Sequence, residues 1–330
     1  MATYYDIFGQ KVQYLASDPN PVQIGQVWYN STSNTAKFEG VSLAAWASAA
    51  SMPNGLSQMA GGGATNSGVT LGGDTGGGFP GWPTATQEFD GTSWSGGGNT
   101  PYTATGIAVS GTNQPTLLMV GGSKNGPVTN ETASYNGSAW SGETVYPASI
   151  AGACGFGAQT ASVFFGGGAG APGGISPFPT STSEYDGSSW TAGGAMPTGR
   201  MNARGTGILT AGLSVGSSPP TPTQTNVTIE YDGSSWTSGG SLSQAGGNGA
   251  ATGTITAAFY FGRDSSPDTA TEQYNGTSWT ASASLSNSHP GAGGFGTNGI
   301  SAIAGGFYPG VGTTEEFTGA GPETKTITTS

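Results

Sequence analysis

The sequence holds few of the residues on which catalytic and metal sites depend. Its 330 residues include one cysteine, Cys154, and one histidine, His289. One cysteine cannot form an intramolecular disulfide, and in Ala-Gly-Ala-Cys-Gly-Phe it fits a small buried residue better than a reactive thiol. One histidine supplies neither a standard zinc site nor a Ser-His-Asp triad, so we expect a plain loop residue. We predict no metal, no cofactor and no enzymatic activity.

The sequence is also poor in positive charge. Seven lysines and arginines stand against 18 aspartates and glutamates, a formal net charge of −11. Nucleic acids and anionic membrane surfaces are bound by clustered cations, so we expect neither as a partner. No segment approaches the roughly 20 apolar residues of a membrane helix, and the first ten residues lack the basic and apolar regions of a secretory signal. We therefore expect no membrane insertion.

The chain does contain a repeated phrase, which runs from an aromatic residue through Asp-Gly or Asn-Gly to a tryptophan five positions on. Its five copies run from Phe89 to Trp94, Tyr135 to Trp140, Tyr185 to Trp190, Tyr231 to Trp236 and Tyr274 to Trp279. Degenerate copies begin at Phe38 and Phe317, and successive first aromatics lie 51, 46, 50, 46, 43 and 43 residues apart. This is the period of a four-stranded propeller blade. Regular aromatics also argue against disorder, despite 62 glycines.

Each full repeat predicts four strands. A Gly/Ala-rich strand such as 152–157 precedes an apolar strand such as 161–165, which ends in Gly-Gly; the third and fourth strands carry the phrase. Asp-Gly and Asn-Gly supply the positive φ of a tight hairpin turn. The aromatic residues can pack between blades, each burying roughly 150–250 Å². The phrase is therefore explained by folding.

The diglycine, the Tyr-Asp-Gly and the tryptophan that follows resemble the kelch repeat. The resemblance covers roughly residues 53–330 and implies an all-β propeller. It leaves function open, because kelch propellers serve enzymes, adaptors and adhesins. Two repeats depart from the pattern, with one glycine at Gly212 or Gly262, and the last repeat lacks its tryptophan.

A second resemblance concerns the N-terminal segment. Residues 25–40, Gly-Gln-Val-Trp-Tyr-Asn-Ser-Thr-Ser-Asn-Thr-Ala-Lys-Phe-Glu-Gly, read as a hairpin and are similar to a module common near the ends of tailed-bacteriophage structural proteins. The Gly/Ser/Thr-rich repeats likewise resemble those of marine phage and cyanophage virion proteins. The resemblance implies a virion location.

The number of blades stays open. Six four-stranded repeats follow Trp46, and residues 323–328 are a plausible fourth strand for the last one. Residues 1–50 form an attachment segment that either completes a seventh blade or stands as a hairpin outside a six-bladed ring, and residues 51–330 form the propeller. The in-phase joining at Met52-Pro53 favours seven blades.

A search for paired catalytic groups finds structural roles instead. Asp90, Asp186 and Asp232 are turn residues, and Glu88, Glu184 and Glu230 precede the aromatics as solvated or blade-edge carboxylates. The spacing of Asp and Gly differs from that of sialidase Asp-boxes, and one histidine is too few for a copper radical oxidase.

Binding residues are sought outside the repeats. Phe79, Trp82 and Phe178 lie on Pro-rich loops, off the repeat pattern, on the face where the longest insertions occur. Aromatics on stiff loops suit stacking on sugars or on a flat protein partner.

These observations favour a non-enzymatic virion protein of a tailed phage, displayed as a tail fibre or appendage component. Tyr4, Tyr5, Phe8, Trp28 and Tyr29 would dock it to other virion proteins or to copies of itself, and the propeller would meet a host-surface glycan or receptor. Two alternatives are a propeller-type carbohydrate-active enzyme, such as a depolymerase, and a cellular kelch adaptor or adhesin.

Overall fold

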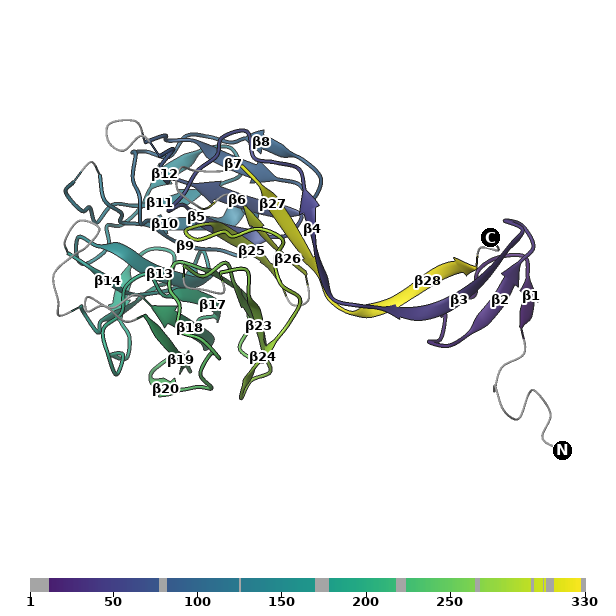
Figure 1. The fold of residues 1–330 in the computed structure, drawn as a ribbon. Coiled ribbons are helices and arrows are strands. Elements are labelled where there is room, and N and C mark those ends of the chain that lie inside the picture. The colour runs from purple at the N-terminus through teal and green to yellow at the C-terminus, as the bar shows by residue number, and fades with distance from the viewer. Residues whose placement is uncertain are drawn as a thin grey trace. The chain divides into compact units, whose positions relative to one another are not determined.

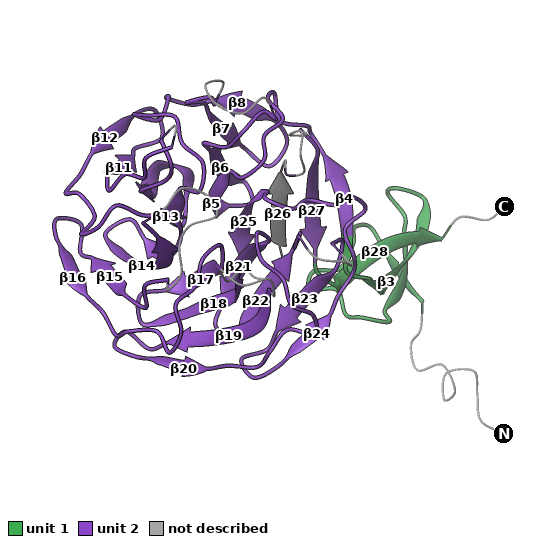
Figure 2. Ribbon diagram, turned by 60° about the vertical axis from the view of Figure 1, so that its left-hand side comes forward, with its two compact units in different colours: residues 1–45, 319–330 green, residues 46–318 purple. Residues whose placement is uncertain are grey.

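The computed structural model describes residues 12–76, 82–124, 126–169, 178–217, 224–264, 268–297, 300–304, 306 and 312–327. Within these ranges the chain is built of strands, with one short 3₁₀ helix at Gln114–Thr116 (Figure 1). None of the helices found there has the length and apolar character of a membrane span. The chain divides into two compact units, residues 46–318 and residues 1–45 with 319–330 (Figure 2).

The larger unit is a β-propeller of six four-stranded sheets. Its first three blades are β5 (Ala60–Ala64), β6 (Ser67–Leu71), β7 (Thr86–Phe89) and β8 (Trp94–Gly96); β9 (Ala108–Ser110), β10 (Leu117–Val120), β11 (Thr132–Tyr135) and β12 (Trp140–Gly142); and β13 (Ala151–Ala158), β14 (Ala161–Gly168), β15 (Thr182–Tyr185) and β16 (Trp190–Ala192). The other three are β17 (Arg204–Ile208), β18 (Ala211–Ser217), β19 (Thr225–Tyr231) and β20 (Trp236–Ser238); β21 (Ala250–Thr254), β22 (Ala257–Phe261), β23 (Thr271–Tyr274) and β24 (Trp279–Ala281); and β25 (Gly293–Thr297), β26 (Ile300–Ala304), β27 (Thr314–Thr318) and β4 (Ala45–Ala49). The innermost strands contact one another in a closed ring, in which β25 meets β5.

The repeated phrase joins each blade to its neighbour. Within a blade the two aromatic rings lie against each other, with centroids 4.8 Å apart for Tyr231 and Trp236. Trp236 Nε1 donates to Thr182 Oγ1 of the preceding blade at 2.9 Å, and the Tyr231 hydroxyl donates to the Glu184 carboxylate of that blade. Tyr135 with Glu88 and Tyr274 with Glu230 repeat the contact. Glu88, Glu184 and Glu230 are thus interblade acceptors, a role that the sequence analysis had not assigned.

Strand β4, which precedes the first blade in the sequence, closes the ring as the fourth strand of the last blade. Trp46 on β4 donates from Nε1 to Thr271 Oγ1 at 2.9 Å. This bond is equivalent to the one from Trp236 to Thr182. Its ring centroid lies 5.3 Å from that of Phe317, the aromatic residue of the last, tryptophan-less phrase. Trp46 therefore supplies the tryptophan that the sixth repeat lacks.

The smaller unit contains one sheet in the order β1-β2-β3-β28. Its strands are β1 (Gln13–Leu15), β2 (Val27–Asn30), β3 (Thr35–Ser42) and β28 (Gly321–Ile327). The expected hairpin is present as β2 and β3, β1 pairs in parallel with β2, and β28 pairs antiparallel with β3. The C-terminal residues expected to complete the last blade therefore belong to this sheet, and β4 takes their place.

The all-β propeller and its seven four-stranded sheets are confirmed. Six of the sheets make the ring, and the seventh is the sheet of the smaller unit, which corresponds to the alternative of six blades and a separate N-terminal hairpin. The unit boundary differs from the expected division at residue 50, because β4 joins the propeller and residues 319–330 join the N-terminal sheet.

Loss of the closing tryptophan should weaken the propeller specifically. We expect Trp46→Ala to lower the free energy of unfolding of the propeller by about 3–5 kcal/mol, because a buried aromatic residue and its hydrogen bond are both lost. Denaturant unfolding followed by tryptophan fluorescence measures this. The matched control is Trp28→Ala, which removes a fully buried tryptophan from the smaller unit. Equal loss of propeller stability in both variants would contradict the assignment.

The interblade tyrosines should make the propeller sensitive to alkali. Burial, followed by the hydrogen bond to Glu184, raises the pKa of Tyr231 to about 12. A pKa raised in the folded state gives stability that is complete below the unfolded value of 10.0 and is lost as the pH rises towards 12. We expect the denaturant midpoint to fall above pH 10, and to fall less steeply in Tyr231→Phe. An identical pH dependence in the variant would show that Tyr231 does not carry the effect.

Candidate functional site: the axial pocket of the propeller

The innermost strands consist mainly of glycine, alanine and other small residues, and this allows six of them to converge on the axis. A Cβ atom added to Gly61 would lie 2.6 Å from the backbone nitrogen of Gly294 in the adjacent blade, and one added to Gly205 would lie 2.8 Å from the carbonyl oxygen of Gly155. Such separations exclude any side chain. The absence of side chains thus sets the spacing of the blades at the axis.

Each innermost strand has two residues in the left-handed backbone region, one at or near each of its ends. The first member of each pair has φ between 53° and 73°, and the set is Gln58, Gly106, Gly152, Asn202, Asn248 and Gly291. The second member follows five residues later with φ between 99° and 130°, and the set is Gly63, Gly111, Gly157, Gly207, Gly253 and Gly296. We call the first set the upper ring.

Backbone hydrogen bonds join the upper ring from blade to blade. Gly152 N donates to Gly106 O at 2.8 Å, Asn202 N to Gly152 O at 2.9 Å, Asn248 N to Asn202 O at 3.2 Å and Gly291 N to Asn248 O at 2.8 Å. Met59 N, next to Gln58, donates to Gly291 O at 3.3 Å and returns the ring to the first blade. These bonds cover five of the six junctions between blades, the exception among the described residues being the junction of Gln58 with Gly106. We call the ring, with these bonds, the collar.

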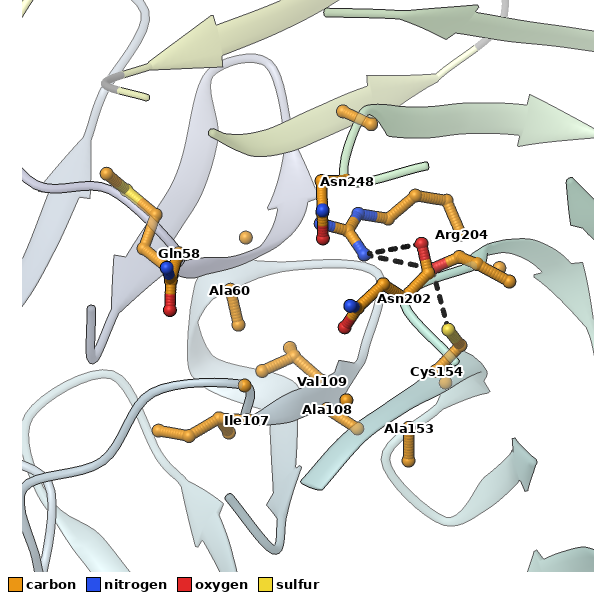
Figure 3. A pocket seen from close by; sticks show the side chains of 18 of the residues that line it. Gln58, Ala60, Ile107, Ala108, Val109, Ala153, Cys154, Asn202, Arg204 and Asn248 are labelled. Atoms are coloured by element: carbon orange, nitrogen blue, oxygen red, sulfur yellow. Dashed lines mark hydrogen bonds between the residues drawn. The ribbon is translucent and has the colours of Figure 1, made fainter. Parts of the chain in front are cut away.

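Within the collar lies a cavity of about 200 Å³, the axial pocket (Figure 3). Ile107, Val109 and Ala153 form an apolar part of its wall, and the side chains of Gln58, Asn202, Asn248 and Arg204 provide polar groups. A second cavity, of about 340 Å³, lies towards the other ends of the same strands and is lined by residues such as Thr206, Ile208 and Thr252.

Among the described residues, Arg204 is the only charged one that lines the axial pocket. Its Nη1 donates to the carbonyl oxygen of Ala203 at 2.9 Å, and its Nε donates to that of Gly249. Its Nη2 has no hydrogen-bond partner among the described residues. The guanidinium group is thus fixed by backbone carbonyls, with no carboxylate paired to it and one edge left for a ligand.

The carboxamide side chains differ in their partners. Asn248 Nδ2 donates to Asp264 Oδ2 at 2.8 Å, which fixes the orientation of this amide. The amides of Gln58 and Asn202 form no side-chain hydrogen bonds to other described residues. They remain available to donate to and accept from a ligand.

Cys154 lies in the wall of the pocket but is not poised for reaction. Its Sγ donates to the carbonyl oxygen of Ala203 at 2.7 Å, and burial raises the pKa of the thiol to about 11. The thiolate is the reactive form of cysteine, so this residue is a packing element.

Of the aromatic residues predicted to bind a ligand, neither Trp82 nor Phe178 lines this pocket. Phe178 is 8% exposed, with its ring against Gly168, so it is a packing residue. Trp82 is half-buried. Phe79 lies outside the described residues.

The residues predicted to dock the chain separate into two groups. Tyr4, Tyr5 and Phe8 lie outside the described residues. Trp28 is fully buried and donates from Nε1 to Asp18 Oδ1 at 2.9 Å, so its role is to stabilise the smaller unit rather than to dock. Tyr29 is half-buried and stacks on the exposed Tyr14, with ring centroids 5.0 Å apart.

His289 is a loop residue, but it is fully buried and its Nε2 lies 3.1 Å from Glu315 Oε1. Burial alone would raise the pKa of Glu315, but hydrogen bonds from the Ser286 and Asn287 amides and from the Asn287 and His289 side chains outweigh it, so the pKa is lowered. In the described part of the chain, no three His, Cys, Asp or Glu residues gather as metal ligands would.

Sequence reasoning missed the polar residues of the axial pocket. A signal was present, since Gln58, Asn202 and Asn248 each stand five residues before a glycine at the start of a repeat. Only the comparison of all six repeats shows that the first position requires the left-handed conformation.

No protein-family model matches the chain, and no curated protein matches it. Among solved structures, the one titled "Structure of YjhT" is similar with a TM-score of 0.66 and 14% sequence identity, over 83% of this chain and 99% of that one. The likeness is one of fold. It supports the propeller and assigns no ligand.

The left-handed glycines should tolerate no side chain. A Cβ added to Gly207, at φ 112°, would lie 2.3 Å from the carbonyl oxygen of Ala211. We expect Gly207→Ala to lower the free energy of unfolding by at least about 2 kcal/mol, from strain and from this clash. Gly142→Ala is the control, because its added Cβ would meet no atom within 4 Å. Similar denaturant midpoints for the two variants would contradict this account of the axis.

Proposed function

We propose that this chain is a non-enzymatic structural protein of a tailed-phage particle, in which the smaller unit attaches to another virion protein and the propeller is displayed to bind the host surface. The observation that carries the proposal is an uncovered apolar face on the sheet of the smaller unit.

The register of the sheet defines this face. Tyr14, Tyr29, Ala36 and Ile327 are aligned across all four strands, so their side chains share one face. Val27, Phe38 and Lys325 form the adjacent row on that face. We call the six residues of these two rows other than Lys325 the open face. Tyr14 is 76% exposed and Ile327 46% exposed.

The opposite face of the same sheet is occupied. Trp28 on that face is fully buried, and Asp18 accepts hydrogen bonds from Trp28 Nε1, Asn30 Nδ2 and Lys37 Nζ. These hydrogen bonds, that of Asn30 first, lower the pKa of Asp18 to about 2. The sheet is therefore stable on one side, while the other presents aromatic and aliphatic side chains to solvent.

Exposed apolar side chains are concentrated in this unit. Nine large apolar residues are exposed in the described part of the chain, and six of them, Val12, Tyr14, Ile24, Val41, Leu43 and Ile327, belong to the smaller unit. We infer from this concentration of exposed apolar residues that the smaller unit carries a protein interface. The resemblance of residues 25–40 to a hairpin of phage structural proteins points to a virion partner.

The propeller supports a binding role better than a catalytic one. Glu88, Glu184 and Glu230 are engaged by tyrosine hydroxyls of neighbouring blades, and Glu315 is engaged by His289 and by loop amides. These acids act as structural acceptors. The collar around the channel gives a rigid scaffold of the kind on which binding loops are usually carried.

The proposal is tested by the composition of purified virions. We expect mass spectrometry to find the chain in wild-type particles, and the double substitution Tyr14→Ser, Tyr29→Ser to reduce its content roughly tenfold or more, the equivalent of about 1.4 kcal/mol of lost contact energy. The control is Ile208→Ser, which changes an exposed apolar residue of the propeller. The propeller of the double variant should unfold as in the wild type.

Two results would contradict the proposal. One is the absence of the chain from wild-type particles. The other is the release of new reducing ends from host polysaccharide by the purified protein, which would favour the depolymerase alternative.

A further inference from the structure

We infer that the axial pocket binds a single acidic sugar, a hexuronic acid unit of a host-surface glycan, with its carboxylate on Arg204. The inference rests on the proposed host-binding role and names the ligand class and the site.

The position of the pocket suits such a role. The upper ring precedes the innermost strands, at the end where the second strand of each blade passes into the connection to the third: Ala60 pairs with Leu71, and Ser57 bridges to Asp74. The two longest connections between strands, from β6 to β7 and from β14 to β15, leave from this same end. The pocket therefore lies at the centre of the face on which the chain places its longest connections.

The size and walls of the pocket fit one sugar ring. A cavity of about 200 Å³ is smaller than the roughly 300–1,000 Å³ of sites for drug-sized ligands. Ile107, Val109 and Ala153 offer an apolar surface for the C–H groups of a pyranose. Gln58, Asn202 and Asn248 offer amide donors and acceptors, which suit hydroxyl groups.

The charge of the pocket selects an acid over a neutral sugar. Of the described residues that line the pocket, Arg204 is the only charged one, and none carries a carboxylate. The chain has a net charge of −11, so carboxylates are in excess. Arg204 is nevertheless held by carbonyl oxygens. A ligand carboxylate on Nη2 would supply the charge-assisted hydrogen bond that the protein does not.

The carboxamides are not required by the fold. Gly106, Gly152 and Gly291 occupy the same positions in three blades with the same left-handed backbone. Asparagine and above all glutamine pay an energetic cost there that glycine does not, and backbone strain of this kind is concentrated at functional sites. Gln58, with φ 54° and an exposed side chain, is the clearest case.

This equivalence supplies a variant that leaves the collar intact. The double substitution Gln58→Gly, Asn202→Gly removes both unpartnered amides and installs the residue that three blades already have. We expect D-glucuronate to bind the purified full chain with a Kd in the millimolar range by calorimetry or saturation-transfer NMR at low ionic strength. We expect at least about tenfold weaker binding in the double variant, with unchanged thermal unfolding.

Arg204→Gln tests the charge. We expect this variant to lose the preference for D-glucuronate over D-glucose, which the wild type should bind at least about tenfold more weakly. Because Arg204 also donates to three backbone carbonyl groups, the glycine variant keeps the inference testable if Arg204→Gln does not fold. Ile208→Ser, in the second cavity, is the matched control and should bind D-glucuronate as the wild type does.

Three results would overturn the inference: no D-glucuronate binding at millimolar concentrations, equal binding of D-glucose, or full binding by the double glycine variant. The measurement uses the purified chain and does not depend on the particle. If virions contain the chain but the purified chain does not bind D-glucuronate, only this inference is refuted. If the purified chain binds D-glucuronate but is absent from virions, only the virion role is refuted.

Discussion

The structure depends on the close approach of six strands around one axis. Positions such as Gly61, Gly205 and Gly294 have no room for a Cβ atom, because the backbone or Cβ atom of a neighbouring blade fills that space. Large side chains at these positions would push the blades apart and leave the interblade bonds of Tyr231 and Trp236 out of reach. The high glycine content, which by composition alone could suggest disorder, is thus the condition for an ordered axis.

Closure of the ring determines where the chain ends go. Since β4 completes the sixth blade beside β27, the chain passes from β3 into this blade and from β27 out to β28. Both passages belong to the same blade, and β3 and β28 then pair with each other over seven residues. The strands before the propeller, β1 to β3, and the strand after it, β28, therefore belong to one sheet.

The repeat could be predicted from the sequence because it is local: an aromatic residue, a turn and a tryptophan lie within six residues. The structural role of Trp46 could not be predicted, because its partners Thr271 and Phe317 are more than 220 residues away in the sequence. The degenerate phrase at Phe38 also suggests a separate blade. Phe178 is a related case, because its place on a loop suggests an exposed ring, whereas the side chain is 8% exposed and lies against Gly168. Contacts outside the local sequence pattern decide both cases.

The axial pocket was missed for a related reason. Its polar residues stand at positions that are equivalent in all six blades, but their identities differ from blade to blade. A search for conserved repeat residues therefore does not find them. Six equivalent positions share one backbone conformation, three of them carry the glycine that this conformation favours, and Gln58, Asn202 and Asn248 carry amides. In a ring of equivalent blades, the fold explains the residues that all blades share. The residues that differ between equivalent positions are therefore the ones to consider for ligand binding.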